Sequence, residues 1–407
     1  MSTGPMARAR RRVTPVTEFL NTEAGGGVIL LAATIVALAW ANSPWSQSYA
    51  DLWHTGVTVG RGSWAISEDL QHWVNDALMA IFFFLVGLEI KREVAAGELR
   101  DPRRASLPAF GAVGGMAAPA LVYLLVAGEG AAAGGWGIPM ATDIAFAVGV
   151  LALLGSKAPA GLKVFLLALA IIDDIGAIAV IAVFYSSGTS VAWMAAAAAT
   201  LAAVLAVRRL GLTRPIAYIP LGAAAWYCTY RAGIHPTIAG VVLGVMTPAW
   251  PVGGRPVLEQ LEHRLHPLSS YVVVPVFALA NAGVALDGEA LSRAGSSRVT
   301  WGIAAGLVVG KTVGITVAAV AARRLRIGRL PDGVDNLHLL GAGALGGIGF
   351  TVALFIASLA FDDAGLQAEA KVGILAGSLV SGLVGVTVLA LNQPPPARRG
   401  RRAPGPA

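Results

Sequence analysis

Long runs of residues without a charged side chain recur along this chain, and they constrain its fold more than any other feature. Residues 25–41 and 175–207 are two examples. A helix needs about 17–25 apolar residues to cross a bilayer, and both runs reach that length. Only 13% of the 407 residues are charged, whereas a soluble domain carries about 25%. The sequence therefore predicts an all-α polytopic membrane protein, in which the 50 glycines allow close helix packing and broken helices.

Polar breaks between the apolar runs predict twelve transmembrane helices. They begin near residues 25, 70, 105, 133, 160, 190, 213, 234, 258, 300, 337 and 368. The first run has no small-residue cleavage site directly after it, so it is predicted to be a retained helix. This division gives a basic N-terminal cytoplasmic segment at residues 1–24, a helical domain at 25–391, and a Pro- and Arg-rich cytoplasmic tail at 392–407.

A short polar segment after the first run has the pattern of a β-hairpin. In residues 54–67, Val57 and Val59 alternate with polar residues before a Gly60-Arg61-Gly62 turn, and Trp64 and Ile66 alternate after it. Alternation of this kind about a glycine-rich turn predicts two short antiparallel strands.

The distribution of basic residues predicts the orientation of the helices. Of the 30 Lys and Arg, 24 fall on one side of a twelve-helix topology, five fall on the other, and Lys311 lies within a run. Because cytoplasmic loops carry the excess of Lys and Arg, both termini are predicted to be cytoplasmic. The net charge of +7 is explained by these short loops, and we expect no nucleic-acid partner.

Few ionisable residues lie within the apolar runs, and these are functional candidates because a buried charge in a bilayer is costly. They are Asp76, Asp143, Asp173, Asp174 and Lys311. Asp173 and Asp174 are adjacent, so on a helix they point about 100° apart, and one can face a cavity while the other faces a partner. Carboxylate oxygens suit a hard cation such as Na⁺, and a buried carboxyl can instead hold a proton.

Two predicted helices contain residues that interrupt a helix at mid-depth. In the fourth, Gly137, Pro139 and Thr142 precede Asp143. The eleventh has glycines close together at Gly343, Gly346, Gly347 and Gly349. Glycine kinks that serve packing alone are an alternative for the eleventh helix. Two interrupted spans in corresponding halves indicate a transport site, where Asp143 and Lys311 are placed to neutralise the partial charges of the helix ends.

The other candidates admit several interpretations. Asp76 is either a cavity residue or a helix-end group, while His235 and Cys228 fit structural roles. Six ionisable residues near the cytoplasmic ends of the second and ninth helices could be solvated caps or proton sensors: Glu89, Arg92, Glu93, Glu262, His263 and His266. His263 and His266 are three residues apart and are a possible metal pair, although no third ligand is evident.

Several of these stretches resemble the NhaA family of bacterial Na⁺/H⁺ antiporters, from about residue 20 to 391. The matching stretches are NDALMAIFFFLVGLEIKRE, ATDIAFAVGVLALLGS, LALAIIDDIGAIAV, LEHRLHP, VFALANAGV, the Gly310-Lys311 pair and GGIGFTVALFIASLAF. The resemblance implies electrogenic, pH-regulated exchange of Na⁺ or Li⁺ for H⁺ across the bacterial inner membrane, with inverted repeats and without a cofactor.

The resemblance also implies a role for particular residues. Asp174 would be the principal Na⁺ ligand, and Asp173 either a second ligand or the partner of Lys311. Thr142 and Asp143 would belong to one broken helix, and Gly346, Gly347 and Gly349 to the other. The six ionisable residues at the cytoplasmic ends would regulate the response to pH, and residues 54–67 would form a homodimer contact.

Two other function classes, a membrane enzyme and a solute symporter, are less consistent with the sequence. A membrane aspartyl protease needs aspartates on two helices, and a prenyltransferase needs separated acidic motifs that hold Mg²⁺ and diphosphate. Neither pattern is present. A sodium-coupled solute symporter would share the architecture, but the buried Lys311 and the lack of an evident solute pocket favour ion exchange.

Overall fold

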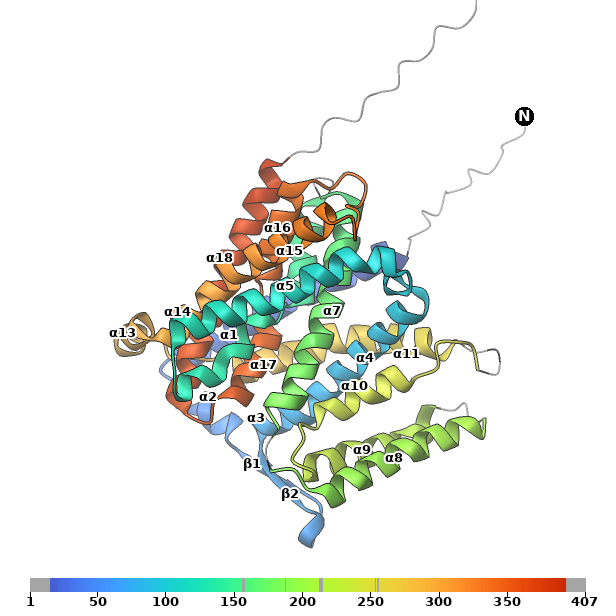
Figure 1. Cartoon of the computed structure of the whole chain (residues 1–407). Helices are drawn as coiled ribbons and strands as arrows, with labels where there is room; N and C mark the ends of the chain where they lie inside the picture. The colour runs from blue at the N-terminus through green and yellow to red at the C-terminus, as the bar shows by residue number, and fades with distance from the viewer. Residues whose placement is uncertain are drawn as a thin grey trace, which may run out of the picture.

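The structure is a computed structural model, and it describes residues 15–392 except 156–157, 187, 212–214, 253 and 255. Of the predicted cytoplasmic segments 1–24 and 392–407, residues 1–14 and 393–407 lie outside the described residues. Helices dominate, and Figure 1 shows them packed side by side into one bundle.

Six continuous helical stretches of the described chain are long and apolar enough to cross a membrane. Three of these stretches are the single helices α5 (Pro102–Ala127), α7 (Ala160–Phe184) and α18 (Ala364–Leu391). A fourth is α8 (Val191–Arg209). Each of the other two stretches contains a π-helical segment between two α-helices. The first consists of α3 (Leu70–Trp73), the π-helical η2 (Val74–Leu78) and α4 (Met79–Ala96). The second consists of α14 (Arg298–Ala305), the π-helical η8 (Gly306–Lys311) and α15 (Thr312–Arg324).

Three further pairs of helices are bent at a short break, and they raise the number of candidate spans to nine. The first pair is α1 (Pro15–Ala41) with α2 (Ser46–Trp53), bent by 115°. The second is η4 (Ala131–Met140) with α6 (Ile144–Leu153), bent by 42°. The third is α16 (Asn336–Gly346) with α17 (Phe350–Ala360), bent by 45°. Helix α1 begins at Pro15, ten residues before the predicted start.

The remaining predicted runs fall on shorter helices. These are α9 (Ile219–Arg231), α10 (Thr237–Met246), α11 (Val257–Leu268), η7 (Ser269–Val273) and α12 (Val274–Asn281). Short connecting helices complete the described chain, and they are η1 (Gly62–Trp64), η3 (Glu98–Arg100), η6 (Pro215–Tyr218) and α13 (Gly288–Ser296). The all-α membrane fold is confirmed, and so are the two predicted breaks, between η4 and α6 and between α16 and α17; the bend between α1 and α2 was not predicted. Length and hydropathy support six to nine spans, so twelve spans and inverted repeats stay predictions.

The predicted hairpin is confirmed as strands β1 (Gly56–Val59) and β2 (Ile66–Asp69), which pair antiparallel with Val57 opposite Glu68. It protrudes from the helical bundle (Figure 1). Asp69 ends β2 and caps α3 by accepting a 2.8 Å hydrogen bond from the His72 backbone N–H. Burial raises the pKa of Asp69, but hydrogen bonds and charge from His72 and a hydrogen bond from His54 outweigh it and hold the pKa below its usual value.

Glycines allow two pairs of helices to pack backbone to backbone. Gly244 of α10 lies against Gly87 of α4, and a β-carbon on either would overlap the other helix. Gly114 of α5 and Gly314 of α15 meet in the same way. Small residues at such contacts let helices approach closely in lipid, where no hydrophobic force drives them together. These contacts fix the position of α4, which carries Glu89, and of α15, which begins directly after Lys311.

Candidate functional site

The two broken helices meet at their breaks. Residues 141–143 separate η4 from α6, and residues 347–349 separate α16 from α17. The Asp143 backbone N–H donates a 2.6 Å hydrogen bond to the Ile348 carbonyl. The Thr142 hydroxyl donates a 2.8 Å bond to the Gly346 carbonyl, which ends α16. Residues of one break therefore form hydrogen bonds with backbone groups that have no helical partner in the other break. Non-helical backbone at membrane depth requires such partners, because lipid offers none.

Asp143 lies between the N-terminal ends of two helices. Its carboxylate accepts a 3.1 Å bond from the Phe146 N–H in the first turn of α6. It also accepts bonds of 3.0 and 2.6 Å from the N–H and hydroxyl of Thr351 in the first turn of α17. Helix N-termini carry partial positive charge, so a carboxylate at this point stabilises both.

Lys311 and Asp173 form a buried ion pair beside the same crossing. The Lys311 ammonium donates to Asp173 at 2.5 Å and to the Thr142 hydroxyl at 2.9 Å. The side chains of both charged residues are fully buried. Through Thr142, the ammonium is linked to the C-terminal carbonyl of α16, whose partial charge is negative. The second Asp173 oxygen has no hydrogen-bond partner among the described residues.

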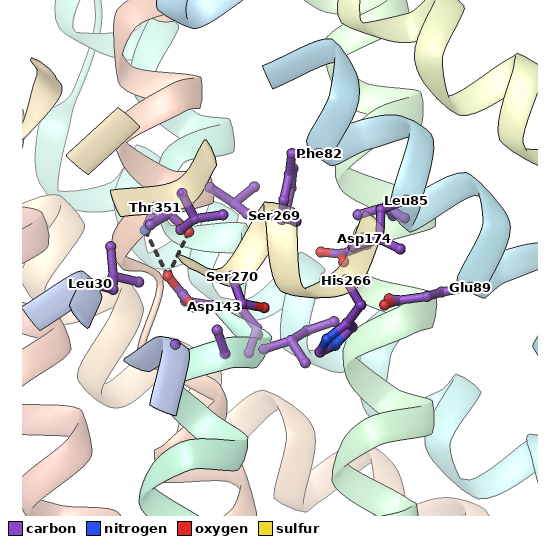
Figure 2. A pocket seen from close by; sticks show the side chains of 17 residues that line it. Leu30, Phe82, Leu85, Glu89, Asp143, Asp174, His266, Ser269, Ser270 and Thr351 are labelled. Carbon is purple, nitrogen blue, oxygen red and sulfur yellow. Dashed lines mark hydrogen bonds between the residues drawn. The ribbon is translucent and has the colours of Figure 1, made fainter. Parts of the chain in front are cut away.

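Asp174 faces away from this pair, into a cavity of about 50 Å³. Asp143, Thr142 and Thr351 line one part of the cavity, and Glu89 and His266 line another. Figure 2 shows Asp174, His266 and Glu89 close together, with Asp143 and its bonds to Thr351 beyond them. One water molecule needs a cavity volume of roughly 10–15 Å³, so this cavity can hold a small cation together with a water molecule. Adjacent positions on α7 thus give one carboxylate an ammonium partner and the other a cavity.

The six candidates for pH regulation lie on α4 and α11, but they do not share one environment. Arg92 forms ion pairs with Glu262 of α11 and, at 3.2 Å, with Glu93. Glu89 and His266 line the Asp174 cavity, and His266 is buried. His263 is exposed, so the two histidines face different surroundings. No group of three metal-binding side chains occurs in the described chain.

Three hydroxyl side chains of the cavity were not identified from the sequence, namely Ser269, Ser270 and Thr351. Ser269 and Ser270 lie on the π-helical η7, directly after α11. In the sequence, Ser269 and Ser270 are polar residues at the start of an apolar run, directly after the LEHRLHP stretch. This position could have indicated their place in the site. A π-helical segment also often marks a functional position.

The other polar candidates lie apart from this cavity. Asp76 is on η2 with its carboxylate 3.7 Å from the His235 ring nitrogen. The His235 ring packs edge-on against Phe355 at 5.0 Å between centroids. Cys228 is buried on α9 without a disulfide. Asp76 does not line the Asp174 cavity.

Comparisons with known proteins agree with this architecture. A family described as Na⁺/H⁺ antiporter 1 matches residues 17–389. The chain is 48% identical to Na⁺/H⁺ antiporter NhaA 3 of Frankia alni, with 95% of this chain and 91% of the relative covered. It is 48% identical to Na⁺/H⁺ antiporter NhaA of an Acidovorax species, with 93% and 92% covered. Na⁺/H⁺ antiporter NhaA 2 of Sorangium cellulosum is 46% identical, with 93% and 90% covered.

Proposed function

Because the chain belongs to the NhaA family of Na⁺/H⁺ antiporters, we propose that Na⁺ and H⁺ compete for the Asp174 carboxylate in the central cavity. The chain is a multi-pass membrane transporter with Na⁺ and H⁺ as substrates, and it is not an enzyme. The observation that carries the proposal is the position of Asp174, a buried carboxylate that lines a cavity large enough for an ion.

The residues around Asp174 have distinct roles in this proposal. Asp173 pairs with Lys311, and the pair holds α7 against η8 close to the ion. Thr142 links this pair to the end of α16, and Asp143 stabilises the starts of α6 and α17. Ser269, Ser270 and Thr351 add oxygen atoms to the cavity wall, which suits Na⁺ and the smaller Li⁺, since both are hard cations.

Alternating access would come from movement about the two breaks. The helices bend by 42° and 45° there, and hydrogen bonds between the breaks couple one to the other. The flexible positions Gly346, Gly347 and Gly349 lie in or beside the second break. A rocking motion would then open the Asp174 cavity to one side of the membrane at a time.

Electrogenic exchange is part of the proposal, with more protons than Na⁺ moving in each cycle. In proteoliposomes loaded with Na⁺ and K⁺ and diluted into K⁺-free medium, valinomycin imposes a potential that is negative inside. This potential should accelerate Na⁺ efflux, because each cycle brings net positive charge into the vesicle. One elementary charge gains about 2.3 kcal/mol per 100 mV. Efflux should also acidify the lumen. A Na⁺ efflux rate that does not depend on the membrane potential would show electroneutral exchange. The absence of a Na⁺-driven change in lumenal pH would contradict antiport itself.

Regulation by pH is assigned to the groups at the ends of α4 and α11, and His266 is the sharpest test. A protonated His266 beside Asp174 would favour loss of the Asp174 proton. Replacing His266 by Gln should therefore move the activity profile about half a pH unit or more toward alkaline pH, with the maximal rate largely kept.

His263→Gln is the matched control for this prediction, since His263 is exposed on the same helix. Its pH profile in proteoliposomes should follow that of the wild type. No shift in His266→Gln would remove His266 from regulation and leave Glu89, Arg92, Glu93 and Glu262 as the remaining candidates. Equal shifts in both variants would show that the effect does not depend on a position in the cavity.

Orientation and assembly complete the proposal. The excess of basic residues on one face supports cytoplasmic termini in a bacterial inner membrane. The exposed strand β1 supports a homodimer contact through the hairpin. A reporter fused after Asn392 that reads as periplasmic would contradict this orientation, and a hairpin deletion that leaves a dimer intact would contradict this contact.

A further inference from the structure

A second and larger cavity, of about 820 Å³, lies apart from the Asp174 site. It opens between the N-terminal parts of α5 and α7 and residues 326–332, within the segment that connects α15 to α16. Four arginines line it, and we call it the arginine cavity: Arg103 and Arg104 from α5, and Arg326 and Arg329 from the connection. It shares no lining residue with the Asp174 cavity.

Positive charge in the arginine cavity is only partly neutralised. Arg104 lies 3.6 Å from Glu98 and 3.8 Å from Asp101. The guanidinium groups of Arg103, Arg326 and Arg329 form no ion pair in the part of the chain that the structure describes, although Asp332 also lines the cavity. Three guanidinium groups are thus available for an anion. Guanidinium binds phosphate well because its donors match the oxygen atoms of that group in pairs.

The backbone of the connection is held in a strained conformation at this place. Arg326 has φ of 59°, and it is the only described residue other than glycine with positive φ. The Ser106 hydroxyl of α5 donates a 3.0 Å bond to the Ile327 carbonyl. At Gly328, a β-carbon would lie only 3.0 Å from that of Leu107. A strained residue persists where its surroundings fix it, and such residues concentrate at functional sites.

One wall of the arginine cavity is apolar. Leu107 and Phe165 are buried there, while Val164 of α7 is 42% exposed. Ala168 lies one turn further along α7, deeper in the span. A free phosphate ion would gain nothing from this wall, whereas a molecule with both a phosphate and a hydrocarbon chain would contact both parts.

We propose that the arginine cavity binds an anionic phospholipid, with its phosphate on Arg103, Arg326 and Arg329 and an acyl chain along Val164 and Ala168. Basic pockets between membrane helices on the cytoplasmic side bind such headgroups. The lipid would hold the connection between α15 and α16 against the start of α7. Since Lys311 precedes α15 and Asp174 lies on α7, bound lipid would stabilise the helices that carry the transport site.

The test is lipid binding by the purified full-length protein in detergent, followed by native mass spectrometry and thermal unfolding. Phosphatidylglycerol should bind and raise the unfolding temperature, and phosphatidylcholine should do so much less. Each arginine near a membrane surface contributes about a fivefold gain in affinity. Replacing all three, as Arg103→Gln, Arg326→Gln and Arg329→Gln, should therefore weaken phosphatidylglycerol binding roughly a hundredfold.

Two matched variants keep the test specific. Three arginines outside the cavity, replaced as Arg209→Gln, Arg264→Gln and Arg324→Gln, remove the same charge and should leave binding within about threefold of wild type, because they do not touch the lipid. Arg103→Lys, Arg326→Lys and Arg329→Lys together should restore part of the binding, because lysine keeps the charge but lacks the paired donors.

Three results would overturn the proposal. If the control variant loses as much phosphatidylglycerol binding as the cavity variant, the effect is only a general one of surface charge. Equal loss in the lysine variant would show that charge does not hold the lipid. Inorganic phosphate that stabilises the wild type as much as phosphatidylglycerol does would assign the cavity to a free anion.

Discussion

Replacing Asp174 by asparagine should abolish Na⁺-driven proton movement in proteoliposomes while the protein still folds and inserts. Asparagine keeps the size of the side chain but has neither the exchangeable proton nor the negative charge that attracts Na⁺. Removing one partner of a buried charge pair at a binding site costs about 2–5 kcal/mol of binding free energy, and each 1.4 kcal/mol is a tenfold change. The exchange rate should therefore fall at least about thirtyfold.

Asp76→Asn is the matched control for this change, because Asp76 is also an intramembrane aspartate but does not line the Asp174 cavity. We expect it to retain most of the exchange activity. Both variants should elute as single species after purification, with helical content equal to the wild type. Robust exchange by Asp174→Asn would remove the carboxylate from the transport cycle, and loss in both variants would show that the assay reports damage to the fold.

Replacing Lys311 by methionine should have the largest effect on stability. Lys311 and Asp173 are 0% and 1% exposed, and their ion pair is 2.5 Å long. Methionine leaves the Asp173 carboxylate buried without its partner, which costs about 3–5 kcal/mol of unfolding free energy. Replacing both residues, as Asp173→Asn with Lys311→Met, removes both charges and should recover most of that loss.

Unfolding of the purified variants in mixed micelles measures this effect. Lys163→Met is the control, since Lys163 is half-buried at the start of α7 and has no ion pair among the described residues. It should change the free energy by less than about 0.5 kcal/mol. A double variant as unstable as Lys311→Met would mean that the lysine stabilises the fold through contacts other than Asp173.

The sequence predicted those parts of the site that depend on local pattern. Adjacent carboxylates in an apolar run predicted that Asp173 and Asp174 face different surroundings, and the structure shows this. Helix-breaking residues predicted both breaks. The hairpin followed from alternation about glycines. These features are encoded by neighbouring residues, so no long-range contact is needed to read them.

The parts that the sequence did not reveal depend on contacts between distant segments. Thr351 reaches Asp143 across 208 positions of the chain, and nothing local to either residue shows it. The two histidines of α11 differ because α4 covers only one side of that helix. The loop arginines were interpreted as topology signals, and only the fold shows that Arg103 and Arg329 line one cavity.

The central claim, that Na⁺ and H⁺ compete for Asp174, is tested most directly by the pH dependence of Na⁺ affinity in the purified protein. Na⁺ binding and proton release should be recorded together, by calorimetry and by a pH-sensitive dye in weak buffer. Between about pH 6 and 8.5, the dissociation constant should fall about tenfold per pH unit for each proton displaced. Protons should appear in solution as Na⁺ binds, and Asp174→Asn should show neither effect. Na⁺ binding of constant affinity without proton release, or wild-type behaviour in Asp174→Asn, would contradict the shared carboxylate.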